Sequence, residues 1–227
     1  AVAAQRTKRP LADLQSRTQG DGIICGTGTV NGRAVAAMAV DYMVLAGTQG
    51  YNHHRKMDRL IERAGRDDLP IVLFAEGGGG RPNDYDVAPL VVAGLNVPSF
   101  RNFAAHRGPK IGIAAGMCFA GNAAMFGLCN VRIATDNSWI GMGGPAMIEG
   151  GGLGSVKPQE IGPSETQKAN GVIDLLRQDE AGAVAAAKAL LGLSAAKACP
   201  QETAPVIPLR SVWPADRSRA YDIRHAV

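Results

Sequence analysis

A buried strand that runs into a glycine-led stretch of small residues is the feature that most constrains this fold. Residues 111–115 are apolar and predict a strand, and Gly116-Met-Cys-Phe-Ala-Gly-Asn-Ala-Ala-Met125 follows without a charge. Glycine permits a tight exit from the strand because it carries no Cβ. We predict a buried helix over residues 118–128. The first turn of a helix leaves backbone N–H groups without intrahelical partners, so it can hold an oxyanion.

A second glycine-rich exit strengthens this interpretation. Glu76-Gly-Gly-Gly-Gly-Arg-Pro82 follows the predicted strand 70–75. Two such exits in one chain predict a site built from backbone amides rather than from reactive side chains.

Composition bounds the class of protein. With 227 residues, 46% of them hydrophobic, the chain is long enough for one sizeable domain. Only 5% of the residues are aromatic and the net charge is +4, with no interleaved basic and aromatic patch, so no nucleic-acid partner is predicted. The apolar runs are shorter than the ~20 residues of a membrane span, and the N-terminus lacks a signal-peptide pattern. We therefore expect a cytoplasmic protein without membrane attachment.

The four cysteines are scattered, without a CxxC pair. This spacing argues against a structural zinc site and for free thiols in a reducing compartment. No metal is predicted.

Hydrophobic periodicity predicts an α/β fold. Asn31-Gly32 between two strand-like runs is a hairpin signal, because both residues tolerate positive φ. No G-x-G-x-x-G follows the first strand, which argues against a dinucleotide-binding fold. The expected strands are 22–30, 33–45, 70–75, 110–115, 131–135, 139–142 and 172–175. The expected helices are 51–65, part of 87–106, 118–128 and 179–193, with one short helix within the peripheral segment 1–20. The proline-rich residues 195–218 predict a linker or surface wrap.

Several ordered motifs resemble the first half of the carboxyltransferase domain of biotin-dependent acyl-CoA carboxylases. They match in order and spacing over roughly residues 20–193. The motifs are Val44-Leu-Ala-Gly-Thr-Gln-Gly50, Asn52-His-His-Arg-Lys56 with Asp58-Arg59, Phe74-Ala-Glu-Gly-Gly-Gly-Gly-Arg-Pro82, Cys118-Phe-Ala-Gly-Asn-Ala-Ala124, Ile140-Gly-Met-Gly-Gly-Pro-Ala-Met-Ile-Glu-Gly150, Pro158-Gln-Glu-Ile-Gly162 and Asn170-Gly-Val-Ile-Asp174.

The resemblance implies a crotonase-like spiral of ββα units, in the acetyl- or propionyl-CoA carboxylase group. It implies transfer of a carboxyl group from carboxybiotin, carried on a separate domain, to the α-carbon of an acyl-CoA. It divides the chain into a peripheral segment 1–20, a catalytic domain 21–194 and a linker 195–227. Because Arg219-Ala-Tyr-Asp-Ile-Arg224 resembles the opening of the second half, we expect the chain to be a first half, inactive alone. The implied partners are that second half, a biotin carboxyl carrier and a biotin carboxylase, in an oligomer.

The resemblance assigns Gly121 and Asn122 as a backbone oxyanion hole for the thioester oxygen, where the alternative is tight packing of a small-residue helix. Many family members carry Asp-Ser-Gly-Gly-Ala-Arg at residues 76–81 and a second glycine at position 122, but neither departure removes a backbone N–H. The candidate substrate-binding residues are Gly47, Thr48, Gly77, Gly78, Gly79, Gly80, Gly143 and Gly144 with the basic face Arg55, Lys56 and Arg59. The alternative for that face is a solvated basic helix surface, which the sequence slightly favours.

Other side chains are assigned structural roles. We interpret Arg81 as a salt-bridge or interface residue. His53 and His54 are adjacent on a helix, about 100° apart, so they do not form a metal or base pair.

Alternative functions remain open from the sequence. One is a subunit of a biotin-dependent or malonate decarboxylase, and another is a non-catalytic CoA-binding module. A third is a hydratase or isomerase that uses Glu76 or Glu149 as its acid or base. The acyl chain is not identified.

Overall fold

The computed structural model describes residues 9–81, 98–194 and, later in the chain, 214, 216, 218, 219, 221 and 222. The chain divides into two units, Ala1–Ala195 and Ala196–Val227. In the second unit, Ser218 donates from its backbone N–H and from its hydroxyl to the Asp216 carboxylate, which closes a turn. Most of the predicted linker, and residues 87–97 of the predicted helical region, lie outside the described residues.

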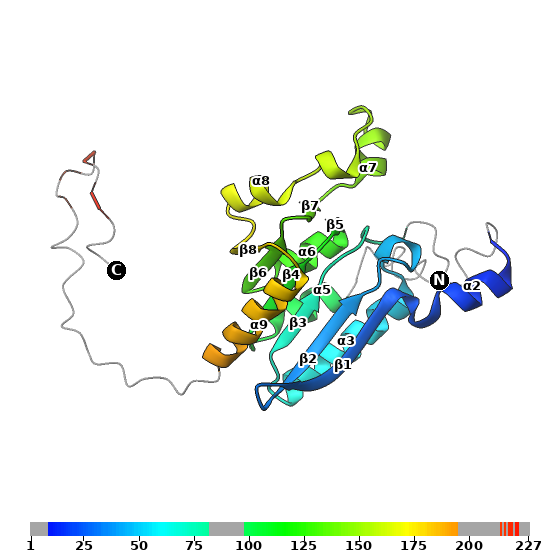
Figure 1. Ribbon diagram of the computed structural model, residues 1–227, viewed down its shortest axis with the longest axis horizontal. Coiled ribbons are helices and arrows are strands. Elements are labelled where there is room, and N and C mark those ends of the chain that lie inside the picture. Colours follow the sequence, from blue (N-terminus) through cyan, green and yellow to red (C-terminus); the bar gives the residue numbers. More distant parts are fainter. Residues whose placement is uncertain are drawn as a thin grey trace. The chain divides into compact units, whose positions relative to one another are not determined.

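A six-stranded sheet with the order β1-β2-β3-β4-β6-β8 forms the centre of the first unit (Figure 1). β1 is antiparallel to β2, and every later pair is parallel. A second, two-stranded parallel sheet joins β5 to β7. The bounds are β1 Ile23–Val30, β2 Arg33–Val40, β3 Ile71–Phe74, β4 Lys110–Ala114, β5 Met117–Phe119, β6 Val131–Thr135, β7 Trp139–Gly141 and β8 Leu175–Arg177.

Helices cover both faces of the large sheet, as expected for parallel strands that are apolar on both sides. The main core joins α3 and α6 to one face, and a second core joins α9 to the other face. The helices are α2 Leu11–Arg17, α3 Tyr51–Arg66, α5 Pro98–Ala105, α6 Gly121–Gly127, α7 Pro145–Gly150, α8 Ser164–Ala169 and α9 Glu180–Ser194, with 3₁₀ turns η1 Gln19–Gly22, η2 Leu45–Gly47 and η3 Pro158–Glu160.

The α/β class and the predicted hairpin are confirmed. Asn31 and Gly32 have φ of 51° and 76°, the turn conformation that matches the twist of a two-residue hairpin. The second strand ends earlier than predicted, at Val40 rather than at residue 45. The strand stops because a turn follows at once, in which the Val44 N–H donates to the Asp41 carbonyl at 3.1 Å, and Leu45 and Ala46 then take positive φ within η2.

The predicted helix 118–128 begins too early. Its first residues belong to β5, and Ala120 then takes φ 49° and ψ −120°, a conformation that no helix contains. This elbow separates the strand from α6, which begins at Gly121.

The strand predicted at residues 172–175 is also displaced. The backbone N–H groups of Val172 and Ile173 both donate to the carbonyl of Gln167, so they close the end of α8. β8 begins only at Leu175. The helices α7 and α8 were not predicted.

Candidate functional site

Three loop segments meet beside β5. Residues 47–50 follow β2, residues 76–81 follow β3, and residues 120–122 follow β5. Gly77 bridges to Cys118, with its N–H 2.7 Å from the Met117 carbonyl oxygen. Gln49 bridges in turn to Gly80. The two glycine-rich exits recognised in the sequence are therefore neighbours in space.

The segments approach so closely that side chains are excluded at two positions. A Cβ on Gly77 would lie 2.2 Å from the carbonyl oxygen of Gly47. A Cβ on Gly79 would lie 2.5 Å from the Cβ of Ala120. Both glycines also have positive φ, of 139° and 86°, which L side chains rarely adopt. Glycine is thus required at positions 77 and 79 by packing as well as by backbone conformation, whereas a Cβ on Gly80 would meet nothing within 4 Å.

The start of α6 presents backbone donors. The N–H of Ala120 donates to the carbonyl of Gly141. The positive φ of Ala120 turns the chain sharply into the helix. The N–H groups of Gly121 and Asn122 lie in the first helical turn, where they have no intrahelical acceptor. Neither donates to another residue in the part of the chain that the structure describes. These two N–H groups are free to bind an oxygen of a ligand.

The Asn122 side chain holds the site together, a role that the sequence interpretation missed. It is 1% exposed. Its Oδ1 accepts from the Gly79 N–H at 2.9 Å, and its Nδ2 donates to the Glu76 carbonyl at 2.8 Å. A weaker contact of 3.5 Å reaches the Gly47 carbonyl. The one available signal was the departure from the glycine that many family members have at this position.

In the second glycine exit, the N–H groups of Gly77, Gly78 and Gly79 are not available as ligand donors. The N–H of Gly77 binds the Met117 carbonyl, that of Gly78 binds Ala46, and that of Gly79 binds Asn122. The predicted site of backbone amides therefore rests on the start of α6. The loop contributes a side-chain-free surface instead.

Thr48 and Gly144 also lie beside these segments, whereas a Cβ on Gly143 would meet Met147 of α7 at 3.8 Å. The Thr48 methyl would lie 3.2 Å from a Cβ on Gly78. Gly144 caps α7, and a Cβ there would meet the ring of Phe119 at 3.8 Å. Thr48 therefore lies beside the loop of residues 77–80, and Gly144 lies beside Phe119 of β5.

Arg81 forms a buried ion pair, as its sequence interpretation predicted. Its Nη2 lies 2.6 Å from Asp21 Oδ1, and the same guanidinium donates to the Thr48 carbonyl. Burial opposes ionisation of Asp21, but the adjacent Arg81 charge outweighs it and holds the pKa of this carboxyl below its ordinary value. The pair ties the segment before β1 to the loop after β3, and the contact with Thr48 adds the loop after β2.

The two histidines serve structure. His53 is fully buried; its backbone N–H donates to Asp21 Oδ2, and its Nδ1 lies 3.2 Å from the Asp21 carbonyl oxygen. His54 Nδ1 lies 3.1 Å from Ser99 Oγ. Burial lowers the pKa of His53 to about 3 and that of His54 to about 4, so both are neutral at pH 7. The Nδ1 atom of His53 contacts Asp21 and that of His54 contacts Ser99, so the two rings do not share one binding partner. Across the described ranges, no three His, Cys, Asp or Glu side chains gather as a metal site.

The residues of the predicted basic face of α3 make different kinds of contact. The Lys56 ammonium binds the carbonyls of Gly20 and Ile23, so it fastens the preceding segment. Arg55 lies over the Tyr51 ring, 5.5 Å from its centroid. Arg55 and Arg59 are exposed.

The two carboxylates considered for acid–base chemistry have different surroundings. Burial raises the pKa of Glu76, and the charge of Glu180 adds to this effect. Its Oε2 would lie 3.1 Å from a Cβ on Gly116, while Glu149 is exposed on α7.

Comparison with known proteins decides the family. The carboxyl transferase domain model matches residues 1–227. The chain belongs to this family. The resemblance drawn from the motifs is confirmed, and the fold is the crotonase-like fold of these carboxyltransferases.

The curated relatives are carboxyltransferase subunits. The chain is 28% identical to the methylmalonyl-CoA carboxyltransferase 12S subunit of Propionibacterium freudenreichii subsp. shermanii, over 91% of this chain and 41% of that protein. It is 30% identical to the acetyl-coenzyme A carboxylase carboxyl transferase subunit beta of Synechococcus sp. (strain JA-3-3Ab), over 73% and 53% respectively. The chain thus spans about half the length of the curated relatives it matches.

Among solved structures, a single-chain, multi-domain long-chain acyl-CoA carboxylase is 47% identical. It covers all of this chain with a TM-score of 0.78, and this chain covers 23% of it. The transcarboxylase 12S hexamer with hydrolysed methylmalonyl-coenzyme A is 27% identical, with a TM-score of 0.68 over 90% of this chain and 42% of that one. A Pseudomonas malonate decarboxylase is 21% identical and shares the fold alone. Within the described ranges, no helix is both long and apolar enough to cross a membrane.

Proposed function

We propose that this domain binds an acyl-CoA and positions it for carboxylation at its α-carbon. The carboxyl group comes from carboxybiotin on a carrier domain. The observation that carries the proposal is the pair of free N–H groups at Gly121 and Asn122, beside the side-chain-free loop of residues 77–80. Family membership supports it.

The proposed chemistry uses fixed backbone dipoles. When the α-carbon of a thioester loses a proton, negative charge develops on the thioester oxygen. The N–H groups of Gly121 and Asn122 stabilise that charge without reorganising, because β5 and α6 hold them. One such donor contributes on the order of 3 kcal/mol to the transition state. When present, carboxybiotin supplies the activated carboxyl group.

The loop of residues 77–80 lets the thioester and pantetheine approach the backbone, and Gly143 and Gly144 line the neighbouring acyl or biotin side. Of the basic residues on α3, Arg55 and Arg59 are the proposed contacts for the CoA phosphates, since Lys56 is occupied by backbone carbonyls.

A long-chain acyl-CoA is the proposed substrate. The supporting observation is the 47% identity with the long-chain acyl-CoA carboxylase, compared with 28% and 30% for the methylmalonyl- and acetyl-CoA relatives cited above. The working assembly includes a second carboxyltransferase half, a biotin carboxylase and a carrier, as an oligomer in the cytoplasm. The free thiols of Cys25, Cys118 and Cys129 accord with a reducing compartment.

The test is reconstitution. The 227-residue chain, alone and with a matching second half, is supplied with carboxybiotin and with acetyl-, propionyl- or palmitoyl-CoA. We expect acyl-CoA binding by the chain alone, transfer only with the second half, and the highest kcat/KM for palmitoyl-CoA. Absence of transfer to any acyl-CoA by the reconstituted pair would reject the function. Preference for acetyl-CoA would reject only the substrate class.

A further inference from the structure

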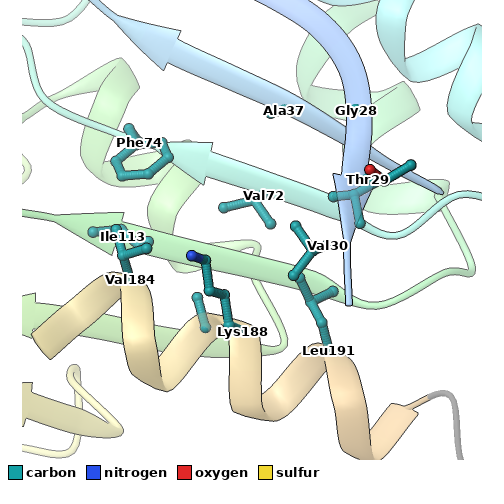
Figure 2. Close-up of a pocket in the computed structure, with 12 residues that line it drawn as sticks. Gly28, Thr29, Val30, Ala37, Val72, Phe74, Ile113, Val184, Lys188 and Leu191 are labelled. Atoms are coloured by element: carbon teal, nitrogen blue, oxygen red, sulfur yellow. The ribbon is translucent and has the colours of Figure 1, made fainter. Parts of the chain in front are cut away.

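A hollow of about 180 Å³ lies between the large sheet and α9 (Figure 2). Its walls are almost wholly aliphatic and include Val30, Val35, Val72, Ile113, Val184 and Leu191. Val35, Val72, Ile113 and Leu191 belong to the α9 core, on the face of the sheet opposite α6. The hollow therefore shares no residue with the oxyanion site.

Small residues create the hollow. Gly28 pairs with Val35 across the hairpin, and directly opposed residues point to the same face of the sheet. Gly28 therefore presents only hydrogen towards α9, and a Cβ there would meet nothing within 4 Å. Ala37 on β2 and Ala187 on α9 are equally short. Gly28, Ala37 and Lys188 are exposed, so the hollow is a groove open to solvent on one side and a ligand can enter it.

Among the described residues that line this apolar space, Lys188 carries the charge. Lys188 projects from α9 on the side that faces the sheet (Figure 2). Its ammonium makes no ion pair or hydrogen bond with any other described residue, whereas its backbone carbonyl accepts from Asn31 at 3.2 Å. After Glu180, α9 carries no acidic residue that could neutralise it.

We propose that this hollow binds a medium-chain aliphatic monocarboxylate, with its chain among the valines and its carboxylate at Lys188. The walls exclude polar ligands, since only apolar groups gain free energy there. An apolar cavity of about 150 Å³ accommodates benzene, so the present volume suits a chain of roughly six to eight carbons. The lone ammonium selects an anion over an ester or an alcohol. This site is independent of the proposed carboxyl transfer.

The test is calorimetric titration of the 227-residue chain with octanoate, and with methyl octanoate as its uncharged analogue. Saturable octanoate binding is expected. Lys188→Met should weaken octanoate about tenfold, equivalent to ~1.4 kcal/mol, and leave methyl octanoate unchanged. Lys157→Met is the matched control, because Lys157 is an exposed lysine outside the hollow, and it should change neither affinity.

A second variant tests the volume. Gly28→Leu places a side chain in the hollow at a strand position with room for a Cβ, and should abolish binding of both ligands. Lys188 is exposed, so its variant folds irrespective of how Gly28→Leu behaves. The proposal is overturned if octanoate does not saturate, if Lys188→Met binds octanoate as tightly as the wild type, or if folded Gly28→Leu retains full affinity.

Discussion

The guanidinium of Arg81 and the carboxylate of Asp21 form an ion pair with a distance of 2.6 Å, and each side chain is only 4% exposed. Removing one partner from a buried pair leaves an uncompensated buried charge. The free energy lost in this way is much larger than the net stabilisation that the intact pair provides. Asp21→Asn should therefore lower the free energy of unfolding by about 3–5 kcal/mol, measured by urea denaturation. Asp13→Asn is the control, since Asp13 pairs with Arg17 at the surface and should change stability by at most ~1 kcal/mol. Equal effects from the two variants would refute this role for Arg81.

Stability should fall in mild acid because of His53 and His54. Their folded pKa values, about 3 and about 4, lie below the ordinary value of 6.5. At pH values between the folded and the ordinary pKa, the unfolded chain binds more protons than the folded chain. The stability contributed by the neutral histidines is therefore fully present above pH 6.5 and is lost as the pH falls. Each histidine contributes a slope of up to ~1.4 kcal/mol per pH unit. Urea unfolding at pH 7.0, 6.0 and 5.0 measures this slope, and it should flatten in a variant carrying His53→Asn and His54→Asn. A wild-type stability that is constant over this range would contradict the prediction.

The proposed oxyanion donors can be tested by deleting one N–H. Gly121 is the first residue of α6, the position where proline is best tolerated in a helix. Gly121→Pro should reduce kcat of the reconstituted enzyme by about 10²–10³-fold, the effect of losing one such donor. Gly121→Ala retains the N–H and places a comparable Cβ near the Gln49 side chain, so it controls for crowding. If both folded variants lose activity equally, the N–H is not the cause.

Asn122 should stabilise the loop through its side chain. Asn122→Ala leaves the Gly79 N–H and the Glu76 carbonyl without their partner, at a cost of about 1–3 kcal/mol. Hydrogen exchange at Gly79 should accelerate along with this loss. Asn170→Ala, an exposed position, should change stability by less than ~0.5 kcal/mol. Unchanged protection of the Gly79 amide would show that the side chain does not hold the loop.

Two glycine substitutions should change the free energy of unfolding in opposite directions. Gly77→Ala combines a φ of 139° with a Cβ only 2.2 Å from the Gly47 carbonyl oxygen, so it should destabilise by more than the ~1–3 kcal/mol of backbone strain alone. Gly65→Ala lies on an exposed part of α3 with nothing within 4 Å of its Cβ. It should stabilise by about 0.5–1 kcal/mol. Thermal unfolding of both variants measures the contrast, and a tolerated Gly77→Ala would show that the loop backbone can relax.

Local patterns predicted the elements whose signals are contained in a few consecutive residues. Asn31-Gly32 determined the hairpin through its tolerance of positive φ, and the spacing of Met57, Leu60, Ile61 and Ala64 determined α3. The limits of the site helix were less predictable. Met117 to Phe119 are apolar enough for either a strand or a helix, and their pairing with β7 decided between them.

The sequence by itself determined the α/β class, the family and the glycine positions that bring two loops together, because each depends on short-range backbone freedom or on ordered motifs. Only the tertiary structure decided which N–H groups remain free. The amides of Gly77 to Gly79 found acceptors on Met117, Ala46 and Asn122, whereas the start of α6 found none among the described residues. Hydrogen-bond partners from distant segments cannot be read from local sequence, since the pairing depends on where the chain returns after many residues. The hollow beneath Gly28 arose in the same way, from small residues on three separate elements.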